Sequence, residues 1–535
     1  MMNSLRQLVE SAARNFPDET FCIFYDENHP QQITYREFES WTSRAGNLFL
    51  NLGVKKGDKV ALLLQNSLEY LYCWFGLAKI GALMVPINYS FLAAETEYIL
   101  NHSESKVLVS DSSKVQQVNE IRHRCPSLQK IGVVQRSDPS LDFCLHSDLE
   151  KYPSDLRPMD IQINDEASIL YTSGTTAEPK GCVVDQEYYL LIGETYVEKM
   201  EITGATTILT SLPLFHMNAQ TTSVMGALFT GATLVLLDRF HPATWWNTIR
   251  RFKPTFFHYL GVIPAILWSL PNSPNDGDQP ARLAEGAGIP PEIHEGFEKR
   301  FNVNMVELYG STEGGAGAIF WCPLKGDRKV GTRCFGRPAE RTLTRIVDDE
   351  DRDVPVGATG ELLVRSAAPQ RPRRGMMQYY FKNPKATEEA WKGGWFHTGD
   401  YVKRDHEGFY YFIDRKKDII RRSGENISAS EIEGVLNSHP QIASSAAIAV
   451  PDPLRIEEIK IYVVLARGEN PQTVPPEEIF RWCKDHLSYF KVPRYLEYRE
   501  SLPRTSTEKI QKHVLKKERP DLIQGSFDRQ KMEKG

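Results

Sequence analysis

The stretch SILYTSGTTAEPKGCVV, residues 168–184, joins an apolar run to a loop of small hydroxyl residues. Three threonines and a serine fall within positions 172–176, and Lys180 follows between a proline and a glycine. Small residues let backbone N–H groups approach a ligand closely, and such loops bind phosphate. The ending typical of a Walker loop is absent. The stretch therefore favours a phosphate site at the end of a strand; the alternative is a polar surface turn.

Apolar runs and amphipathic segments alternate along the chain on both sides of this loop. Buried strands are predicted at 59–65, 83–88, 105–111, 232–238 and 304–310. Residues 35–53 have apolar side chains at a helical period, and Thr34 with Glu37 predicts a capping box before them. This alternation predicts α/β architecture with largely parallel sheets, whose ligand loops lie at the carboxyl ends of strands. The loop after residue 171 and the loop after residue 309 both have this position.

The composition and the pattern of the sequence change after residue 414. A stretch rich in basic residues, FIDRKKDIIRRSGENIS at 412–428, is followed by a compact pattern of strands and helices of domain size. Ser428 and Glu431 predict a capping box at the start of one of these helices. We therefore expect a large N-terminal domain of several subdomains at 1–414 and a hinge at 415–417. A small mobile α+β C-terminal domain is expected at 418–519 and a disordered tail at 520–535.

Composition and charge limit the partners that the protein can have. The 535 residues exceed the usual size of one hydrophobic core, so two or more domains are expected. Lys and Arg number 64 against 69 Asp and Glu, a net charge of -5 that lacks the basic character of nucleic-acid-binding proteins. The eight cysteines form no C-x-x-C pair, which favours a reduced, cytoplasmic setting. No apolar run approaches the ~20 residues of a membrane span.

Six motifs occur in the order and approximate spacing of the adenylate-forming superfamily, which the chain resembles over nearly its whole length. They are YTSGTTAEPKG (171–181), LPLFHMNAQ (212–220), LYGSTEG (308–314), GWFHTGD (394–400), YFIDRKKDIIRRSGENIS (411–428) and LPRTSTEKI (502–510). This superfamily comprises acyl-CoA ligases, peptide-synthetase adenylation domains and luciferases. The second half of the chain is most similar to the carnitine/crotonobetaine-type CoA ligases.

The resemblance implies an ATP-dependent carboxylate–CoA ligase, an acid–thiol ligase. In this reaction a carboxylate and MgATP give acyl-AMP and pyrophosphate, and the thiol of coenzyme A then displaces AMP. The implied cofactors are ATP, Mg²⁺ and coenzyme A, the partner is a small carboxylic acid, and the enzyme would be a monomer or a homodimer. Two alternatives remain open: a stand-alone adenylating enzyme that loads a carrier protein, and a non-catalytic relative that binds nucleotide or acyl ligand.

The resemblance also implies a nucleotide site. The residues implied to hold the β- and γ-phosphates are Thr172, Ser173, Gly174, Thr175, Thr176 and Lys180. Thr312 would contact the α-phosphate, and Glu313 would hold Mg²⁺, a hard ion that prefers oxygen. Tyr309 would stack on adenine, while Asp400 and Arg415 would bind the ribose, because one carboxylate can accept from both hydroxyls. Taken alone, these residues also fit ordinary roles as a capping acid, a core tyrosine and a turn aspartate.

Four further residues are implied to act on the acyl group or on the motion between domains. His216 resembles the histidine at the mouth of the acyl pocket, and Lys509 the catalytic lysine that bridges the carboxylate and the α-phosphate. Lys417 falls at the hinge about which the small domain swings. Gly424 would then line the pantetheine tunnel, where the missing side chain leaves room for the thiol.

Several positions depart from the pattern of the family, among them Asp414, Asp185 and Gln186, and two bear on activity. Ala177 stands where most members have glycine, and a positive φ there would cost roughly 1–2 kcal/mol. Glu508 replaces the glycine that usually precedes the catalytic lysine. Neither change removes a catalytic atom, so both leave the enzymatic prediction in place while keeping a degenerate enzyme as the alternative.

The segment LAEGAGIPP, residues 283–291, is implied to form one wall of the acyl pocket, with Glu285, Gly286, Ala287 and Gly288 in it. Glu285 is unexpected there, because a carboxylate should repel a carboxylate substrate and is costly to desolvate. One hypothesis is that Glu285 is the counter-ion of a cationic acyl group such as a trimethylammonium, assisted by aromatic residues such as Tyr259. The alternative is that Glu285 turns outward or pairs with an arginine.

Overall fold

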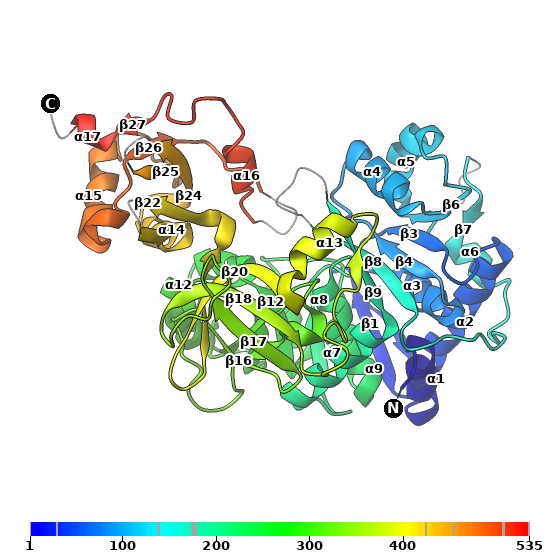
Figure 1. The fold of residues 1–535 in the computed structure, drawn as a ribbon. Coiled ribbons are helices and arrows are strands. Elements are labelled where there is room, and N and C mark those ends of the chain that lie inside the picture. Colours follow the sequence, from blue (N-terminus) through cyan, green and yellow to red (C-terminus); the bar gives the residue numbers. More distant parts are fainter. Residues whose placement is uncertain are drawn as a thin grey trace.

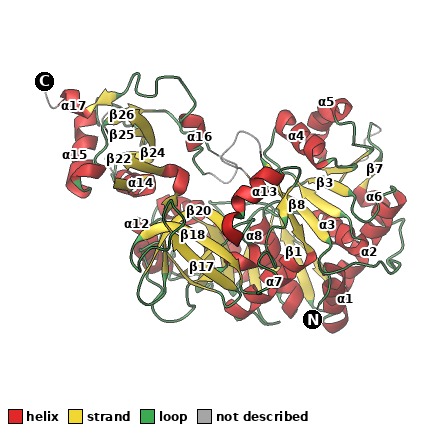
Figure 2. Cartoon of the chain, in the orientation of Figure 1, coloured by secondary structure: helices red, strands yellow, loops and turns green. Residues whose placement is uncertain are grey.

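The structure is a computed structural model that describes residues 2–27, 30–135, 140–172, 179–422, 425–452, 455–504 and 509–532. Helices and strands alternate through the first 400 residues and build one large N-terminal part, and a smaller C-terminal part stands beside it (Figures 1 and 2). Within the described chain, no helix combines the length and apolar character that a membrane crossing requires.

The first sheet of the N-terminal part contains the strand that opens the phosphate-type loop. Six of its strands, from β8 to β7, pair in parallel, and β9 and β19 add antiparallel neighbours at the β8 edge. Among the described residues its order is β19 (Tyr379–Tyr380), β9 (Lys180–Asp185), β8 (Glu166–Thr172), β4 (Leu83–Pro86), β3 (Lys59–Leu63), β5 (Val107–Ser110), β6 (Lys130–Val133) and β7 (Phe143–Cys144).

The second sheet is longer and changes character along its width. Its middle strands, from β14 to β1, are parallel, and from β15 to β17 the pairing is antiparallel. In the described chain the order is β17 (Thr342–Val347), β18 (Thr359–Ser366), β20 (Phe396–Arg404), β21 (Tyr410–Arg415), β16 (Cys334–Pro338), β15 (Phe320–Trp321), β14 (Asn304–Tyr309), β13 (Leu283–Ala287), β12 (Phe256–Leu260), β10 (Thr207–Thr210), β11 (Thr233–Leu237), β1 (Thr20–Tyr25) and β2 (Gln31–Thr34).

Helices pack on these sheets where the apolar period predicts them. The capping box of α2 is present with both of its hydrogen bonds, from the Glu37 N–H to Thr34 and from the Thr34 N–H to Glu37. The helices of this part are α1 (Leu5–Asn15), α2 (Tyr35–Asn51), α3 (Leu68–Ile80), α4 (Ala93–Ser103), α5 (Val115–Ile121), α6 (Leu145–Leu149), α7 (Gln186–Lys199), α8 (Met217–Ala219), α9 (Met225–Thr230), α10 (Trp245–Phe252), α11 (Val262–Ser269), α12 (Pro291–Phe301) and α13 (Pro384–Ala390). A π-helical turn, η3 (Gln220–Val224), joins α8 to α9.

The C-terminal part has its own sheet and its own hydrophobic core. Ile420, Ile461 and Leu496 are fully buried in a cluster drawn from this part alone. Its elements in the described residues are β22 (Ile419–Arg422), β23 (Glu425–Ser428), α14 (Ala429–Asn437), β24 (Ile442–Asp452), β25 (Ile456–Leu465), α15 (Pro476–His486), β26 (Tyr495–Tyr498), α16 (Lys512–Leu515), β27 (Phe527–Asp528) and α17 (Arg529–Met532). The predicted class, a large α/β part with parallel-rich sheets and a small α+β part, is confirmed.

The structure differs from the sequence prediction at the C-terminal tail. Residues 520–535 are polar and were expected to be disordered, but the described residues of this segment pack on the C-terminal sheet. β27 pairs with β26, Arg494 forms an ion pair with Asp528, and Lys460 donates to the Leu522 carbonyl. The tail is held by hydrogen bonds and ion pairs to buried and half-buried charged side chains of the C-terminal part, which its composition alone does not reveal.

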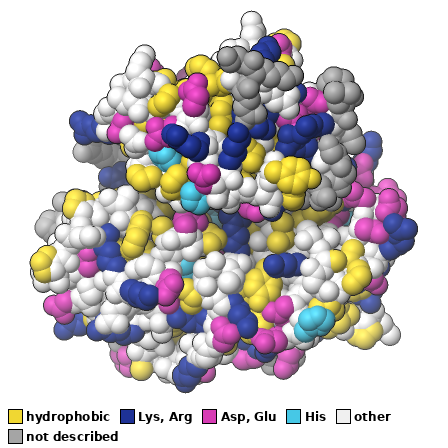
Figure 3. Space-filling view, turned by 90° about the vertical axis from the view of Figure 1, so that its left-hand side faces the viewer, with side chains coloured by type: hydrophobic (Ala, Val, Ile, Leu, Met, Phe, Trp, Pro, Cys, Tyr) yellow, Lys and Arg dark blue, Asp and Glu magenta, His cyan; other side chains and the backbone are white. Residues whose placement is uncertain are grey.

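Polar contacts connect the two parts. Arg333 of the N-terminal part donates to the Ser430 hydroxyl at 2.6 Å, and Asp349 accepts from Arg421 at 3.0 Å. In the space-filling view a seam separates the C-terminal part, at the top, from the N-terminal part, and Lys and Arg side chains lie along it (Figure 3). Within the described residues, each hydrophobic cluster belongs to one part only, so the two parts are joined by hydrogen bonds and ion pairs.

Candidate active site

The loops that follow β8 and β14 meet although they leave different sheets. The hydroxyl of Thr172, the last residue of β8, donates to the Glu313 carboxylate at 3.0 Å. Tyr380, on β19, donates its hydroxyl to the same carboxylate oxygen at 3.2 Å. The structure thus brings the two motifs together around Glu313, as expected for loops at the carboxyl ends of strands. Ser173, Gly174, Thr175, Thr176 and Ala177 lie outside the described residues.

Lys180 adds a positive charge to this corner of the molecule. It begins β9, and its ammonium group lies 5.1 Å from the centre of the Tyr380 ring. Tyr380 also lines a cavity of about 490 Å³, whose other lining residues are Arg373, Tyr379, Lys382, Asn383, Pro384, Thr387, Glu388 and Trp391. Tyr380 therefore separates Glu313 from an open, partly basic space, a role for which the sequence QYYF gives no signal.

The turn after β14 presents Thr312 and Glu313 through fixed backbone contacts. The Tyr188 hydroxyl donates to the Thr312 carbonyl at 3.0 Å, and the Gly314 N–H donates to the Ser311 hydroxyl at 3.0 Å. Gly315 has φ +46°, and a Cβ there would lie 2.3 Å from the Gly375 carbonyl oxygen, so only glycine fits. Small residues in STEGG therefore let the turn approach neighbouring backbone.

Tyr309, Asp400 and Arg415 form a second group. The Tyr309 hydroxyl donates to Asp400 at 2.6 Å, and the Arg415 guanidinium lies 2.9 Å from the other carboxylate oxygen. Asp400 and Arg415 are direct cross-strand partners on β20 and β21, so sheet register places them together. Burial raises the pKa of Asp400, and Arg415 and Tyr309 act against that rise. The Tyr309 ring packs 4.9 Å from the Phe335 ring, an aromatic floor suited to a flat base.

Lys509 of the C-terminal part lies close enough to this group to sense its charges. Burial and the positive charge of Arg415 lower the pKa of Lys509, and Asp400 opposes this. Lys509 also contributes to the environment of His216, whose pKa is lowered to about 4, mainly by burial. The Nε2 atom of His216 is buried and has no hydrogen-bond partner in the described chain. Both parts of the molecule therefore contribute to one site, and His216 is neutral there at pH 7.

The Gly/Ala-rich segment ends β13 beside this site. A Cβ on Gly286 would lie 2.1 Å from the Tyr259 carbonyl oxygen, and Gly288 has φ +79°, so both positions require glycine. The Glu307 carboxylate, on β14, accepts from the N–H groups of Gly288 and Ile289 at 3.0 and 3.1 Å. Glu307 thus fixes the shape of this wall. The sequence offered one signal for it, an acid inside the otherwise apolar strand NMVELYG.

Glu285 is buried, 1% exposed, and its hydrogen-bond and ion-pair partners in the described chain are Tyr196 and His258. The alternatives of an outward-turned or arginine-paired Glu285 are therefore wrong. The proposed help from Tyr259 is also wrong, because its hydroxyl donates to Glu307 at 2.5 Å. Strand register explains this: Glu285 pairs with His258, whereas Tyr259 pairs with Gly286 and faces the other side of the sheet.

Lys417 lies between the two parts in a short 3₁₀ turn, Lys416–Asp418. Its carbonyl accepts from the Lys516 ammonium at 2.8 Å, and burial lowers the pKa of its own ammonium group. Gly424 and Glu508 lie outside the described residues. The turn thus directly joins β21 of the N-terminal part to β22 of the C-terminal part.

The site offers a single carboxylate for a metal ion. No group of three or more His, Cys, Asp or Glu side chains suited to a metal occurs among the described residues. Glu313, with the Thr172 and Tyr380 hydroxyls around it, fits Mg²⁺, because that ion commonly takes one or two protein carboxylates and obtains its other ligands from phosphates and water.

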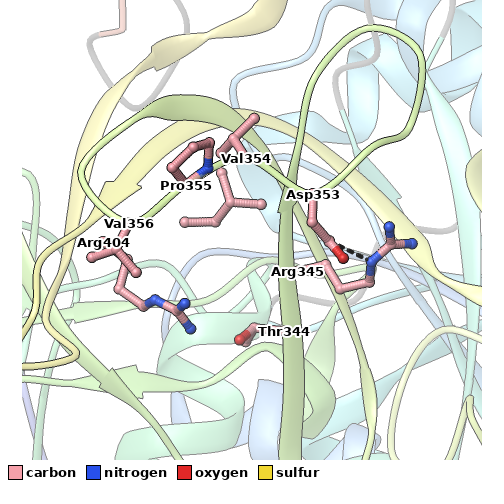
Figure 4. Close-up of a pocket in the computed structure, with 8 residues that line it drawn as sticks. Thr344, Arg345, Asp353, Val354, Pro355, Val356 and Arg404 are labelled. Atoms are coloured by element: carbon pink, nitrogen blue, oxygen red, sulfur yellow. Dashed lines mark hydrogen bonds and ion pairs between the residues drawn. The ribbon is translucent and has the colours of Figure 1, made fainter.

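A second cavity, of about 290 Å³, contains none of these groups. It lies against β17 and is lined by Thr344, Arg345, Ile346, Asp353, Val354, Pro355, Val356 and Arg404 (Figure 4). Arg345 and Asp353 form an ion pair of 2.7 Å across it. Its charged groups are already paired or exposed, so the chemistry of the molecule lies at the site described above.

Known proteins resemble this chain over nearly all of its length. Residues 9–381 match the family model described as AMP-binding enzyme, and residues 431–509 match the AMP-binding enzyme C-terminal domain. A crotonobetaine/carnitine–CoA ligase of Proteus mirabilis is 35% identical over 524 residues, covering 95% of this chain and 98% of that protein. The crystal structure of the anthranilate CoA ligase AuaEII with anthranoyl-AMP superimposes with a TM-score of 0.86 at 25% identity, covering 96% and 97% of the two chains.

A further solved structure supports the fold. ATP-bound MatB from Rhodopseudomonas palustris has a TM-score of 0.85 at 23% identity and covers 98% of this chain and 100% of its own. The match extends through both parts of the molecule, so the C-terminal part is included in the shared architecture.

Proposed function

Because this chain belongs to the family of AMP-binding enzymes, we propose that it is an acid–thiol ligase that couples a small carboxylic acid to coenzyme A. In the first step the carboxylate attacks the α-phosphorus of ATP, which gives an acyl-AMP and pyrophosphate. In the second step the thiol of coenzyme A attacks the acyl carbon, forms the thioester and releases AMP. The observation that carries this proposal is that Lys509, from the C-terminal part, lies close enough to Asp400 and Arg415 of the N-terminal part for their charges to act on its pKa.

The first step needs positive charge because it brings an anion to a polyanion. Two like charges 4 Å apart repel by about 4 kcal/mol at an effective dielectric constant of 20. Lys509 is placed to offset this repulsion by bridging the carboxylate and the α-phosphate. We assign Thr312 to the α-phosphate. The groups assigned to the β- and γ-phosphates are Thr172, Ser173, Gly174, Thr175, Thr176 and Lys180.

The nucleoside is assigned to the second group of the site. Tyr309 provides a face for adenine, and its hydroxyl keeps Asp400 oriented. Asp400 can accept hydrogen bonds from both ribose hydroxyls, and Arg415 favours the charged form of that carboxylate against the effect of burial. Glu313 would hold Mg²⁺, which when bound neutralises phosphate charge. His216, being neutral, can lie beside the substrate carboxylate without competing for the charge of Lys509.

The second step requires a different arrangement of the C-terminal part. Lys509 and its neighbours close one side of the site, so the thiol can enter only when they withdraw. We propose that residues 415–417 are the hinge between a domain at 1–414 and a mobile domain from 418, with Lys417 as the pivot. Gly424 would then face the thiol, where the missing side chain leaves room.

The acid that we propose is of the betaine type, a carboxylate with a quaternary ammonium group. The support is the 35% identity, over nearly the whole chain, to a crotonobetaine/carnitine–CoA ligase. The segment 283–288 is assigned as one wall of its pocket. We further infer a cytoplasmic enzyme that acts as a monomer or homodimer; its eight cysteines are all free and buried, as a reducing compartment allows.

The test is pyrophosphate and AMP release from a panel of carboxylic acids, each measured with and without coenzyme A. A ligase releases pyrophosphate with the correct acid and turns over AMP only when the thiol is present. Release of AMP that is independent of coenzyme A but dependent on a carrier protein would assign the chain to carrier loading. No pyrophosphate release with any acid of the panel would contradict the proposal.

A further inference from the structure

A buried hydrogen-bonded network surrounds Glu285. The His258 ring lies 2.9 Å from one oxygen of the Glu285 carboxylate, and the Tyr196 hydroxyl lies 3.2 Å from the same oxygen. Tyr196 and His258 also contact each other, and the Ser223 hydroxyl lies 2.7 Å from the second ring nitrogen of His258. These four side chains come from α7, η3, β12 and β13, and each is at most 1% exposed.

The protons can be placed so that each of these contacts is a hydrogen bond, with Nε2–H of His258 and the Tyr196 hydroxyl both donating to the carboxylate. Both contacts are made to the same oxygen of Glu285, Oε2, so the network holds the carboxylate by that oxygen alone.

The network leaves the anion incomplete. The other carboxylate oxygen of Glu285, Oε1, is buried and has no hydrogen-bond partner among the described residues. Within the same residues no Lys or Arg forms an ion pair with Glu285. Buried polar atoms without a partner are rare in folded proteins, so Oε1 is the atom at which a ligand from outside the chain would complete the network.

The network lies at the correct depth for a substrate. His216 immediately precedes the helix that begins at Met217, and Ser223 lies in the π-helical turn that continues it, seven positions further on, which corresponds to roughly 10 Å at the rise of an α-helix. The His216 end lies beside Lys509, where the carboxylate reacts. In an acid with an ammonium nitrogen four bonds from its carboxyl carbon, the two groups are about 5 Å apart at bond lengths near 1.5 Å. Such an acid spans about half of the distance from His216 to Ser223. The remaining distance is about that of one ionic contact between its cation and Glu285.

We propose that Glu285, held by Tyr196, His258 and Ser223, binds the cationic group of the substrate and selects quaternary ammonium acids over neutral acids of the same shape. This inference rests on the proposed ligase function and names the residue that sets its specificity. The ring of Tyr196 lies 5.6 Å from that of Trp321 and 5.8 Å from that of His258, so aromatic surface accompanies the charge. Aromatic rings and a carboxylate together are suited to a trimethylammonium group.

The test compares two acids of the same shape. 4-(Trimethylammonio)butanoate carries the cation, and 5,5-dimethylhexanoate replaces its nitrogen by carbon. With the full-length enzyme, kcat/KM for pyrophosphate release is measured for both acids in the wild type, Glu285→Gln and Glu285→Asp. The ratio of the two values isolates the charge, because a general loss of structure lowers both alike.

The wild type should prefer the cationic acid by at least about 30-fold, and Glu285→Gln should abolish the preference mainly through a higher KM for that acid. Glu285→Asp keeps the charge and should retain part of the preference. The matched control is Glu307→Gln, a buried carboxylate on the neighbouring strand and the opposite face, which should weaken both acids alike.

The outcomes separate the two proposals. If the wild type releases no pyrophosphate with any acid, the ligase function fails. If it prefers the cationic acid and Glu285→Gln keeps that preference, the ligase stands and the role of Glu285 is overturned. If Glu285→Gln does not fold, Glu285→Asp decides: a partly retained preference supports the inference, and a lost preference overturns it. Equal use of both acids by the wild type overturns the inference directly.

Discussion

At the scale of single residues, Lys509 connects the two parts of the molecule in one chemical step. Desolvation and the neighbouring Arg415 lower its pKa, and Asp400 opposes this. Anions that bind beside Lys509, such as ATP and a carboxylate, therefore favour its charged form. This is expected of a group that acts in the transition state of adenylation.

Lys509→Ala should therefore separate the two half-reactions. Loss of one desolvated charge contact is expected to cost ~3–5 kcal/mol, a decrease of about 10²–10⁴ in the rate of acyl-AMP formation. Thioester formation from supplied acyl-AMP should be nearly unchanged, because Lys509 has left the site by then. The two rates are measured as pyrophosphate release and thioester formation. Lys385→Ala, on an exposed helix, is the control, and an equal loss in both half-reactions would contradict the assignment.

The same residues predict the pH dependence of the first step. Lys509 must be protonated to bridge two anions, and its pKa in the free enzyme lies below 10.5 because burial disfavours the charge. Its proton is present below that pKa and is lost as the pH rises through it. The pKa of His216 is about 4, so His216 stays neutral throughout the neutral range.

The value of kcat/KM for adenylation should thus decrease as the pH rises through the alkaline range, with a midpoint below pH 10.5. It should show no step near pH 6.5 from His216. In Lys509→Arg the alkaline decrease should move to higher pH, since arginine keeps its proton. The measurement is pyrophosphate release across the pH range in the wild type, Lys509→Arg and His216→Phe. A step near pH 6.5 that disappears in His216→Phe would show that His216 titrates in its ordinary range and sink this account.

At the scale of elements, the sequence predicts a helix most strongly where the apolar period and a capping box agree. The helix after Thr34 is present with its capping box, because one N-cap hydroxyl and one acid three residues later are a local signal. Residues 476–490, PEEIFRWCKDHLSYF, read as one helix, but α15 ends at His486, since Leu487 is extended and a 3₁₀ turn follows at Tyr489–Lys491. Helix ends depend on tertiary contacts that a periodic pattern does not contain.

The residues of the site also divide into those that the sequence predicted to meet and those whose contacts it did not predict. Thr172 and Glu313 come from the two loops at strand ends, so topology predicted that they would lie near each other, whereas Asp400 and Arg415 were assigned to the site by the resemblance alone. The contacts of Tyr380, Glu307 and His258 arise from sheet register and helix packing. Register also explains the error at Tyr259, because a shift of one residue moves a side chain to the other face. A single sequence does not specify which strands are neighbours at that precision.

The hinge turn is the element on which the proposed domain motion depends. Lys417 lies inside it, and proline at that position fixes φ near −65° and removes the N–H group. Lys417→Pro should therefore leave acyl-AMP formation nearly normal and strongly slow thioester formation, the reverse of Lys509→Ala. Lys417→Ala, which keeps the backbone free, should leave both steps nearly intact. Normal rates of both steps in Lys417→Pro would place the pivot elsewhere.

At the scale of the whole molecule, the contacts between the two parts are suited to exchange. They are hydrogen bonds and ion pairs: Arg333 with Ser430, and Asp349 with Arg421 and Lys416. Exposed pairs of this kind contribute little stability each, about 0–1 kcal/mol. Each part keeps its own hydrophobic core, so separation exposes little apolar surface, and relative motion is the default for such interfaces.

This argument leads to a prediction about locking the arrangement. Arg333 and Ser430 face each other across the seam, 2.6 Å between Nη1 and Oγ, while Lys509 lies in the site. Cysteines at both positions can be joined by a bis-methanethiosulfonate reagent, and the eight native cysteines are all buried, so the reagent reaches the new pair first. The cross-linked enzyme should form acyl-AMP and pyrophosphate at the rate of the untreated double variant.

Thioester formation should fall by about two orders of magnitude in the cross-linked enzyme, because a joined interface cannot withdraw Lys509 to admit the thiol. Dithiothreitol cleaves the linker and should restore the second step without changing the first. Arg333→Cys and Ser430→Cys, each treated alone, are the controls for modification without a bridge. Full thioester formation by cross-linked protein, verified by its shifted mobility under non-reducing electrophoresis, would mean that both half-reactions occur in the arrangement seen here. The swing of the C-terminal part would then be unnecessary to the chemistry.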